Sequence, residues 1–144
     1  MNILVINAGS SSMKYQLIDM VNERVMAKGM IEWTGGEKAV LTHETQGKER
    51  YIADIEVPDY ALAVKKVLDA LLDKDHGAIG DIAEIGAVGH RIVHGGEGFS
   101  DSVLIDDTVM GTLGESIELA PLHNPANIMA IEACRRYMPS VKMA

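Results

Sequence analysis

The sequence predicts an α/β domain in which helices pack on a mixed β-sheet. Short apolar segments with strand periodicity fill residues 2–57. Helical spacing begins after Pro58 and then alternates with one further strand. The chain has 144 residues, of which 47% are hydrophobic and 24% charged, so it has the size and composition of one globular domain with a real core.

Five strands are expected in the first part of the chain. Residues 2–7 form an apolar, β-branched run that is typical of a strand buried on both faces. Residues 13–20 alternate between apolar and polar, which indicates a second strand with one partly wet face. The alternation continues in a third strand through Val25, Ala27, Gly29 and Ile31. Two weaker strands are expected at residues 39–43 and 51–57.

The second part of the chain is expected to be mainly helical. Residues 59–73 carry leucine and valine at helical spacing, and Pro58 suits the start of that helix. Residues 85–93 form another buried strand, and residues 107–119 a helix weakened by two glycines.

The last helix is expected from Asn124, which can cap it, with Pro125 at its first position, to Met138. Residues 141–144 begin what reads as a further strand, so we expect a chain truncated within an element.

Charge and cysteine content exclude several classes of function. The net charge of −8 disfavours general binding to nucleic acid or to an anionic membrane, which needs a basic surface. Cys134 is the only cysteine, so an internal disulfide and a thiolate metal cluster are both excluded. The sequence has neither a signal-peptide pattern nor about 18 consecutive apolar residues, which predicts a cytoplasmic protein.

The first motif lies between the first two strands, at residues 7–14. Gly9 permits a tight turn, and successive backbone N–H groups there can bind an anion. Three serines add hydroxyl donors, and Lys14 adds a positive charge. The motif lacks the Gly-Lys-Ser/Thr ending of a Walker A loop and does not lead into a helix. A phosphate loop and an ordinary polar hairpin are both open on these residues alone.

The second motif, residues 90–97, follows a buried strand, where α/β sheets bind ligands. The planar fork of Arg91 matches a carboxylate or phosphate. His90 and His94 could be acids, bases or metal ligands, but a structural role is favoured for both. Glu97 could simply pair with Arg91.

The third motif, residues 119–127, places His123 between two prolines just before a helix N-terminus, where the dipole favours anions. A histidine on such a turn can donate to an anion. It could equally well only hydrogen-bond the backbone of a helix-entry loop.

Together the three motifs resemble the acetate kinase family. The matching segments are residues 5–19 (VINAGSSSMKYQLID), 89–97 (GHRIVHGGE) and 118–127 (ELAPLHNPAN). The resemblance implies an actin-like, ribonuclease H-like kinase fold with two related domains, of which residues 1–144 are the N-terminal one. It also implies Mg²⁺-dependent, reversible phosphoryl transfer between ATP and acetate, giving ADP and acetyl phosphate.

The resemblance assigns roles to residues of all three motifs. Asn7 resembles the magnesium-site residue at the end of the first strand. Lys14 resembles an ATP-site residue, with Ser10 and Ser12 beside the phosphates.

Residues of the second and third motifs resemble the acetate side of the site. Arg91 resembles the residue that grips the carboxylate or the acetyl phosphate, and His123 the histidine near the transferred group. Both would donate to the charge of the transferred group. Val93 and Leu122 resemble the wall around the acetate methyl.

Two alternatives remain at this point. One methylene in an apolar pocket changes affinity by only about 1–3 kcal/mol, so a propionate or other short-chain carboxylate kinase stays open. The isolated chain could instead be a non-catalytic module that binds phosphate or a partner. We expect the family's remaining catalytic residues beyond this chain, no activity from the chain alone, and a homodimer for the full enzyme.

Overall fold

The computed structural model describes residues 1–90 and 124–144, and it gives no side-chain description at positions 124, 125 and 127. The strands of this part are β1 (Asn2–Ala8), β2 (Ser12–Asp19), β3 (Arg24–Gly35), β4 (Lys38–Thr45), β5 (Tyr51–Glu56), β6 (Ile85–His90) and β7 (Lys142–Met143). The helices are α1 (Tyr60–Leu72), the one-turn 3-10 helix η1 (Ile82–Glu84) and α3 (Asn124–Tyr137). Residues 91–93 of the sixth expected strand, and the helix expected at 107–119, lie outside the described residues.

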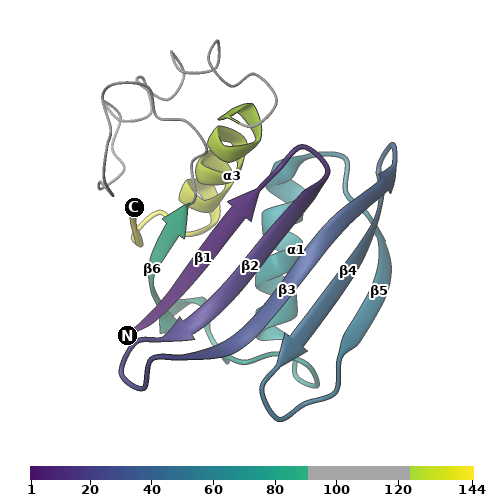
Figure 1. Cartoon of the computed structure of the whole chain (residues 1–144). Coiled ribbons are helices and arrows are strands. Elements are labelled where there is room, and N and C mark those ends of the chain that lie inside the picture. Colours follow the sequence, from purple (N-terminus) through teal and green to yellow (C-terminus); the bar gives the residue numbers. More distant parts are fainter. Residues whose placement is uncertain (91–123) are drawn as a thin grey trace.

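The seven strands form one mixed sheet in the order β5-β4-β3-β2-β1-β6-β7 (Figure 1). Strands β1 to β5 are antiparallel neighbours, whereas β6 runs parallel to β1 and β7 runs parallel to β6. The predicted α/β class and mixed sheet are therefore confirmed. Strands β1 and β6 are parallel, and Ile6 pairs with His90. The first two motifs therefore begin side by side, at the carboxyl ends of these two strands.

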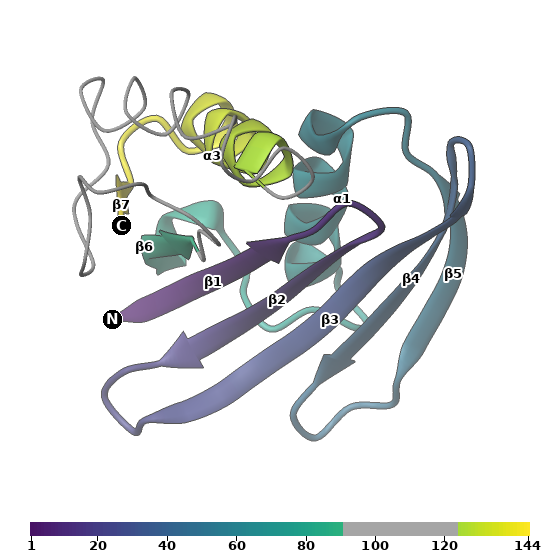
Figure 2. The same cartoon turned by 45° about the horizontal axis from the view of Figure 1, so that its top comes forward.

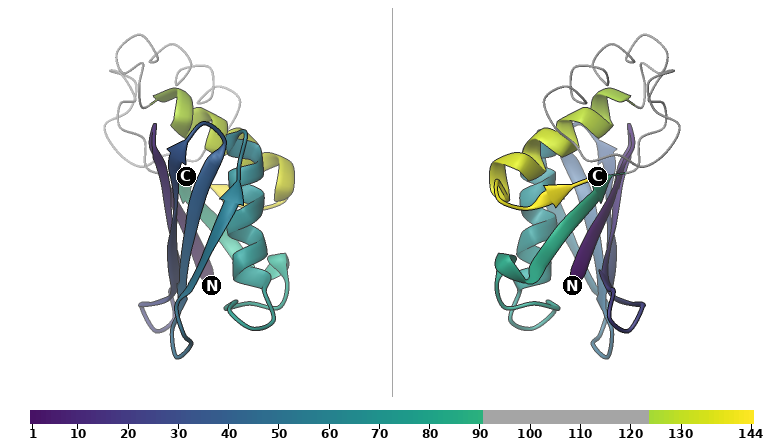
Figure 3. Two further views of the ribbon diagram at one scale, coloured as in Figure 1. Left: turned by 90° about the vertical axis from the view of Figure 1, so that its right-hand side faces the viewer. Right: turned by 90° about the vertical axis from the view of Figure 1, so that its left-hand side faces the viewer.

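Helices α1 and α3 lie side by side on one face of the sheet and leave the opposite face open in the described part (Figures 2 and 3). The core lies between this helical layer and the sheet. Its side chains include Leu4 and Ile6 of β1, Val67 of α1 and Ile131 of α3, all at most 1% exposed.

The expectation that β1 is buried on both faces is wrong for the described residues. Leu4, Ile6 and Ala8 point into the core, whereas Val5 and Asn7 are only half-buried on the open face. The apolar run of β1 could not show this, because the sequence does not indicate which face lacks a helix.

A register shift explains one further departure from the expected alternation. Leu17 pairs with Ala27, but Ile18 pairs with Val25, so one extra residue of β3 bulges at this point. An extra residue reverses the face to which the following side chain points. Val25 is consequently 40% exposed, although Ala27 and Ile31 are buried as the alternation predicts.

The first helix begins one residue later than expected. The Asp59 side chain accepts a hydrogen bond from the Leu62 N–H at 2.8 Å and so caps α1, while Pro58 precedes the cap. The apolar stripe is confirmed, because Val64 and Leu68 are among its buried residues. The start of α3 at Asn124 and the expected final strand, observed as β7, are also as predicted.

Candidate functional site

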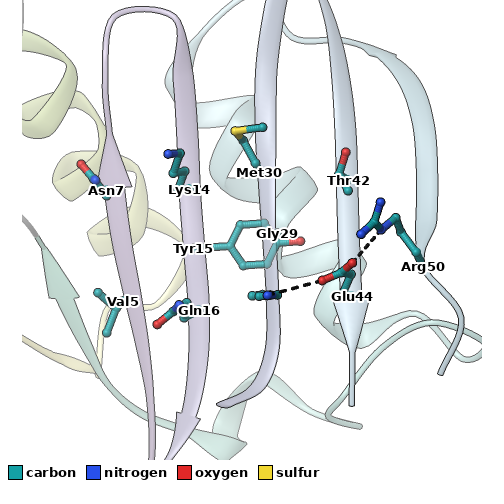
Figure 4. Close-up of a pocket in the computed structure, with 11 residues that line it drawn as sticks. Val5, Asn7, Lys14, Tyr15, Gln16, Gly29, Met30, Thr42, Glu44 and Arg50 are labelled. Atoms are coloured by element: carbon teal, nitrogen blue, oxygen red, sulfur yellow. Dashed lines mark hydrogen bonds and ion pairs between the residues drawn. The ribbon is translucent and has the colours of Figure 1, made fainter. Parts of the chain in front are cut away.

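Asn7 and Lys14 are direct partners in the antiparallel pairing of β1 and β2. Directly opposite residues have Cβ atoms about 4.5–5.5 Å apart and point to the same face. That face is the open one, because the neighbours Ala8 and Met13 are buried beneath the helices. Both side chains line a groove of about 570 Å³ on this face (Figure 4).

The loop between β1 and β2 is a tight hairpin. The Gly9 N–H donates to the Ser12 carbonyl at 2.7 Å, which leaves Ser10 and Ser11 exposed at the tip. Ser12 begins β2 and shares the face of Lys14, because residues two apart in a strand point the same way. The structure therefore gathers Asn7, Ser12 and Lys14 on one face beside the loop that carries Ser10.

Gly9 does not provide the special backbone conformation that a glycine in this motif suggests. In the described part of the chain, the glycines with positive φ are Gly36 and Gly47, both in hairpin turns. A Cβ on Gly9 would meet the Ser12 carbonyl oxygen at 3.5 Å and Ser12 Oγ at 4.0 Å, which are ordinary contacts. The tight turn is present, but its backbone does not require glycine.

Two residues outside the motif hold this loop in place. The Tyr60 hydroxyl donates to the Gly9 carbonyl at 2.6 Å, and the Trp33 backbone N–H donates to the Ser11 carbonyl at 3.0 Å. Reasoning from the sequence missed both, because Tyr60 lies 51 positions from Gly9 and nothing in the motif refers to it. Only the tertiary arrangement of α1 and β3 around the hairpin brings them to it.

The groove carries three basic side chains and one carboxylate. Glu44 accepts from Arg50 Nε at 2.6 Å and lies 3.7 Å from Lys28 Nζ (Figure 4). The Arg50 hydrogen bond lowers the pKa of Glu44. Of the three basic side chains in Figure 4, Lys14 is the one that lies nearest the Gly9–Ser12 loop, and no dashed line joins it to Glu44. The end of the groove next to the loop is therefore the better placed to receive an anion.

A buried polar network lies beneath the groove. Tyr15 Oη is 2.5 Å from His43 Nδ1, and His43 Nε2 is 3.2 Å from the His76 carbonyl oxygen. Since a carbonyl only accepts, Nε2 carries the proton and Nδ1 accepts from Tyr15. Thr45 Oγ1 also donates to the His76 carbonyl, at 2.6 Å. Burial lowers the pKa of His43, so this histidine is neutral at pH 7.

His90, at the carboxyl end of β6, is also a neutral histidine. Burial lowers its pKa to about 4. Its Nε2 atom is buried and has no hydrogen-bond partner among the described residues. A neutral imidazole is not a charged donor, so the structure does not favour His90 as a cationic ligand of phosphate.

The other predicted site residues are Arg91, Val93, Leu122 and His123, and all four lie outside the described residues, as do His94 and Glu97. Within residues 1–90 and 124–144, no group of three or more His, Cys, Asp or Glu side chains could hold a metal ion. None of the described helices is long and apolar enough to cross a membrane.

Comparison with known proteins identifies the family. The model of the acetokinase family matches residues 2–144. The chain belongs to the acetokinase family. A curated acetate kinase from Clostridium kluyveri is 54% identical over 143 residues, which cover 99% of this chain and 35% of that enzyme.

Solved structures of an acetate kinase and of a propionate kinase show the same fold. The crystal structure of Porphyromonas gingivalis acetate kinase matches with a TM-score of 0.93 at 40% identity, over 99% of this chain and 36% of that one. A propionate kinase from Francisella tularensis matches with a TM-score of 0.85 at 32% identity, over 99% of this chain and 35% of that one. The predicted actin-like fold is confirmed, and the chain spans about a third of the length of these similar proteins.

Proposed function

We propose that this chain is the N-terminal domain, residues 1–144, of an acetate kinase, and that it supplies part of a site where ATP phosphorylates acetate reversibly. The observation that carries the proposal is the Asn7–Lys14 pair beside the Gly9–Ser12 loop, in a chain 54% identical to a curated acetate kinase. Lys14 would neutralise phosphate charge, with Ser10 and Ser12 donating beside it.

The donors near the loop fit a magnesium ion that arrives with the nucleotide. Mg²⁺ keeps several waters and usually takes one or two protein ligands together with substrate phosphates. The Asn7 amide oxygen would be one such ligand, and Asn7 shares its face of the sheet with Lys14. When bound, Mg²⁺ would reduce the charge repulsion between the phosphates and the attacking carboxylate. The part played by the chain is to hold Asn7 and Lys14 on one rigid pair of strands.

The acetate side of the site would come from the second and third motifs. We assign Arg91 to the carboxylate and His123 to the charge that develops on the transferred phosphoryl group. Val93 and Leu122 would contact the methyl group. Strand pairing supports part of this assignment, because β6 ends at His90, which pairs with Ile6 of β1, the residue directly before Asn7.

Propionate is the second candidate substrate. It is favoured by the structural match to a propionate kinase, which at a TM-score of 0.85 and 32% identity is weaker than the match to an acetate kinase. An apolar wall discriminates by one methylene only weakly, about 10–200-fold at best. We therefore propose acetate as the preferred substrate, with propionate accepted less well.

The test is acyl phosphate formation by a protein of the length of the curated acetate kinases that carries this chain at its N-terminus, called here the family-length protein. Purified protein is incubated with ATP, Mg²⁺ and either acetate or propionate, and the product is trapped with hydroxylamine. We expect product that depends on Mg²⁺ and a higher kcat/KM for acetate. Residues 1–144 alone should give none, and gel filtration should show the family-length protein as a homodimer. Higher kcat/KM for propionate would reassign the substrate, and no product with either acid would refute the proposed function.

A further inference from the structure

The geometry points to Tyr60 as a positioning residue for the phosphates of the nucleotide, acting through the Gly9 carbonyl. This inference rests on the proposed function, since it concerns the same loop. Tyr60 Oη donates to the Gly9 carbonyl at 2.6 Å. In the proposed role Tyr60 does not contact the substrate, and its effect passes through the backbone of the hairpin.

One hydrogen bond to a carbonyl fixes the direction of the next amide. In a planar trans peptide the C=O of residue 9 and the N–H of residue 10 point in opposite directions. Tyr60 holds the Gly9 carbonyl toward α1, so the Ser10 N–H is directed away from α1. The Ser11 carbonyl is held in the same way by the Trp33 N–H, at 3.0 Å. Two peptide units of the proposed phosphate loop are thus oriented from outside the loop.

Tyr60 replaces a bond that the hairpin does not make. The turn is closed by the Gly9 N–H donating to the Ser12 carbonyl at 2.7 Å, and the reciprocal bond, from the Ser12 N–H to the Gly9 carbonyl, is absent among the described residues. The Gly9 carbonyl would therefore lack a described protein donor without Tyr60. Backbone amides that line an anion site are effective when their directions are fixed before the ligand arrives.

Tyr60 is itself held rigidly. It is the first residue of α1, directly after the cap that Asp59 forms with the Leu62 N–H. Its ring packs against Trp33, with ring centres 5.3 Å apart, and the Trp33 indole N–H donates to the Val57 carbonyl at 3.0 Å. Burial raises the pKa of Tyr60, so the hydroxyl keeps its proton at neutral pH. A fixed and protonated donor is what positioning of the loop requires.

The test is Tyr60→Phe in the family-length protein, with Tyr51→Phe as the matched control. Phenylalanine keeps the ring and removes only the hydroxyl. Tyr51 lies on β5, three strands away from β2, and its ring stacks on the His76 ring with the ring centres 4.3 Å apart. Loss of one hydrogen bond should raise the KM for ATP about three- to tenfold, and the KM for acetate should change less than about twofold. Tyr51→Phe should change neither KM.

Hydrogen exchange gives a second readout that needs no activity. The backbone amides of residues 9–12 should exchange several-fold faster in Tyr60→Phe than in wild type, and Tyr51→Phe should leave their exchange unchanged. Unchanged exchange at residues 9–12 would overturn the inference, whether or not the enzyme is an acetate kinase. In an active enzyme, equal effects on both KM values, or an unchanged KM for ATP, would also overturn it. Failure of the proposed function would appear separately, as wild-type protein that forms no acyl phosphate.

Discussion

The Tyr15 hydroxyl lies 2.5 Å from His43 Nδ1, although the two residues are on strands that are not neighbours. Gly29 lies on the strand between them and pairs with Tyr15 on one side and with His43 on the other. Figure 4 shows the tyrosine ring extending from β2 across β3 at Gly29. The absence of a side chain at position 29 is what lets the ring cross the sheet.

Gly29→Ala should therefore destabilise the domain. A Cβ at position 29 would overlap with Tyr15 Oη and with the Thr42 carbonyl oxygen, and the latter is backbone that cannot move without disturbing β4. Overpacking of this kind costs about 1–3 kcal/mol, and the Tyr15–His43 bond would be displaced as well. Urea denaturation followed by circular dichroism measures the free energy of unfolding.

Gly35→Ala is the matched control for that substitution. Gly35 ends the same strand, and a Cβ there would meet no atom within 4 Å. Its free energy of unfolding should stay within about 0.5 kcal/mol of wild type. Equal stability of the two variants would mean that the crossing of Tyr15 over Gly29 does not constrain the sheet.

Neutral His43 predicts a loss of stability in mild acid. Burial lowers the pKa of His43 in the folded chain below its ordinary value of 6.5. As the pH falls through 6.5 the unfolded chain takes up a proton first, so stability is fully present above this pH and decreases below it. The slope contributed by one such group reaches about 1.4 kcal/mol per pH unit.

Urea denaturation at pH 7.5, 6.5 and 5.5 isolates that contribution when wild type is compared with His43→Gln. The variant should be less stable at pH 7.5 but should lose less stability between pH 6.5 and 5.5. His90 has the same sign of effect, because its pKa is lowered to about 4, and it serves as an internal reference retained in both proteins. Parallel curves for the two proteins would contradict the account of His43.

Asn7→Ala in the family-length protein should raise the Mg²⁺ concentration needed for half-maximal activity. An amide oxygen can coordinate magnesium, and loss of a ligand should cost about 10–100-fold in affinity for the metal. Gln16→Ala is the control, since Gln16 lines the same groove but pairs with Val5, farther from the loop. Magnesium titration at saturating ATP and acetate measures the effect. Equal shifts in both variants would argue against a magnesium role for Asn7.

Arg91→Ala should lower kcat and raise the KM for acetate, because removal of a preorganised donor to the transition state costs on the order of 10²–10³ in rate. Arg91→Lys should restore little, since an ammonium lacks the bidentate fork. Steady-state kinetics and a melting curve for both variants and Glu97→Gln separate this role from a structural ion pair. Comparable loss of activity and of Tm in Glu97→Gln would favour the ion pair.

The fold could be predicted largely because the periodicities of strand and helix differ. Strands β1 to β5 and helix α1 were expected within a few residues, and the Asn7–Lys14 pairing follows from a short hairpin between two strands. The register shift near Val25 could not be predicted, since a bulge leaves no clear pattern in composition.

The anchoring of the proposed phosphate loop could not be predicted either. Tyr60 contacts Gly9 only after β2 to β5 have placed α1 beside the hairpin, and the residue type alone does not indicate such a bond. The same holds for Gly29, which reads as an unremarkable strand glycine until Tyr15 is seen to cross it. Local pattern therefore located the motif, whereas the contacts that hold and surround it depend on distant strands.

Kinetics of Lys14→Ala against Lys28→Ala in the family-length protein test most directly whether the hairpin end of the open face binds the phosphates of ATP. Both lysines line the same groove, but Lys28 pairs with Glu44 at 3.7 Å, whereas Lys14 lies opposite Asn7. Loss of a charged hydrogen bond predicts a rise of about 10–100-fold in the KM for ATP in Lys14→Ala, with the KM for acetate nearly unchanged, and little effect in Lys28→Ala. An unchanged KM for ATP in Lys14→Ala, or an equal rise in both variants, would contradict the account.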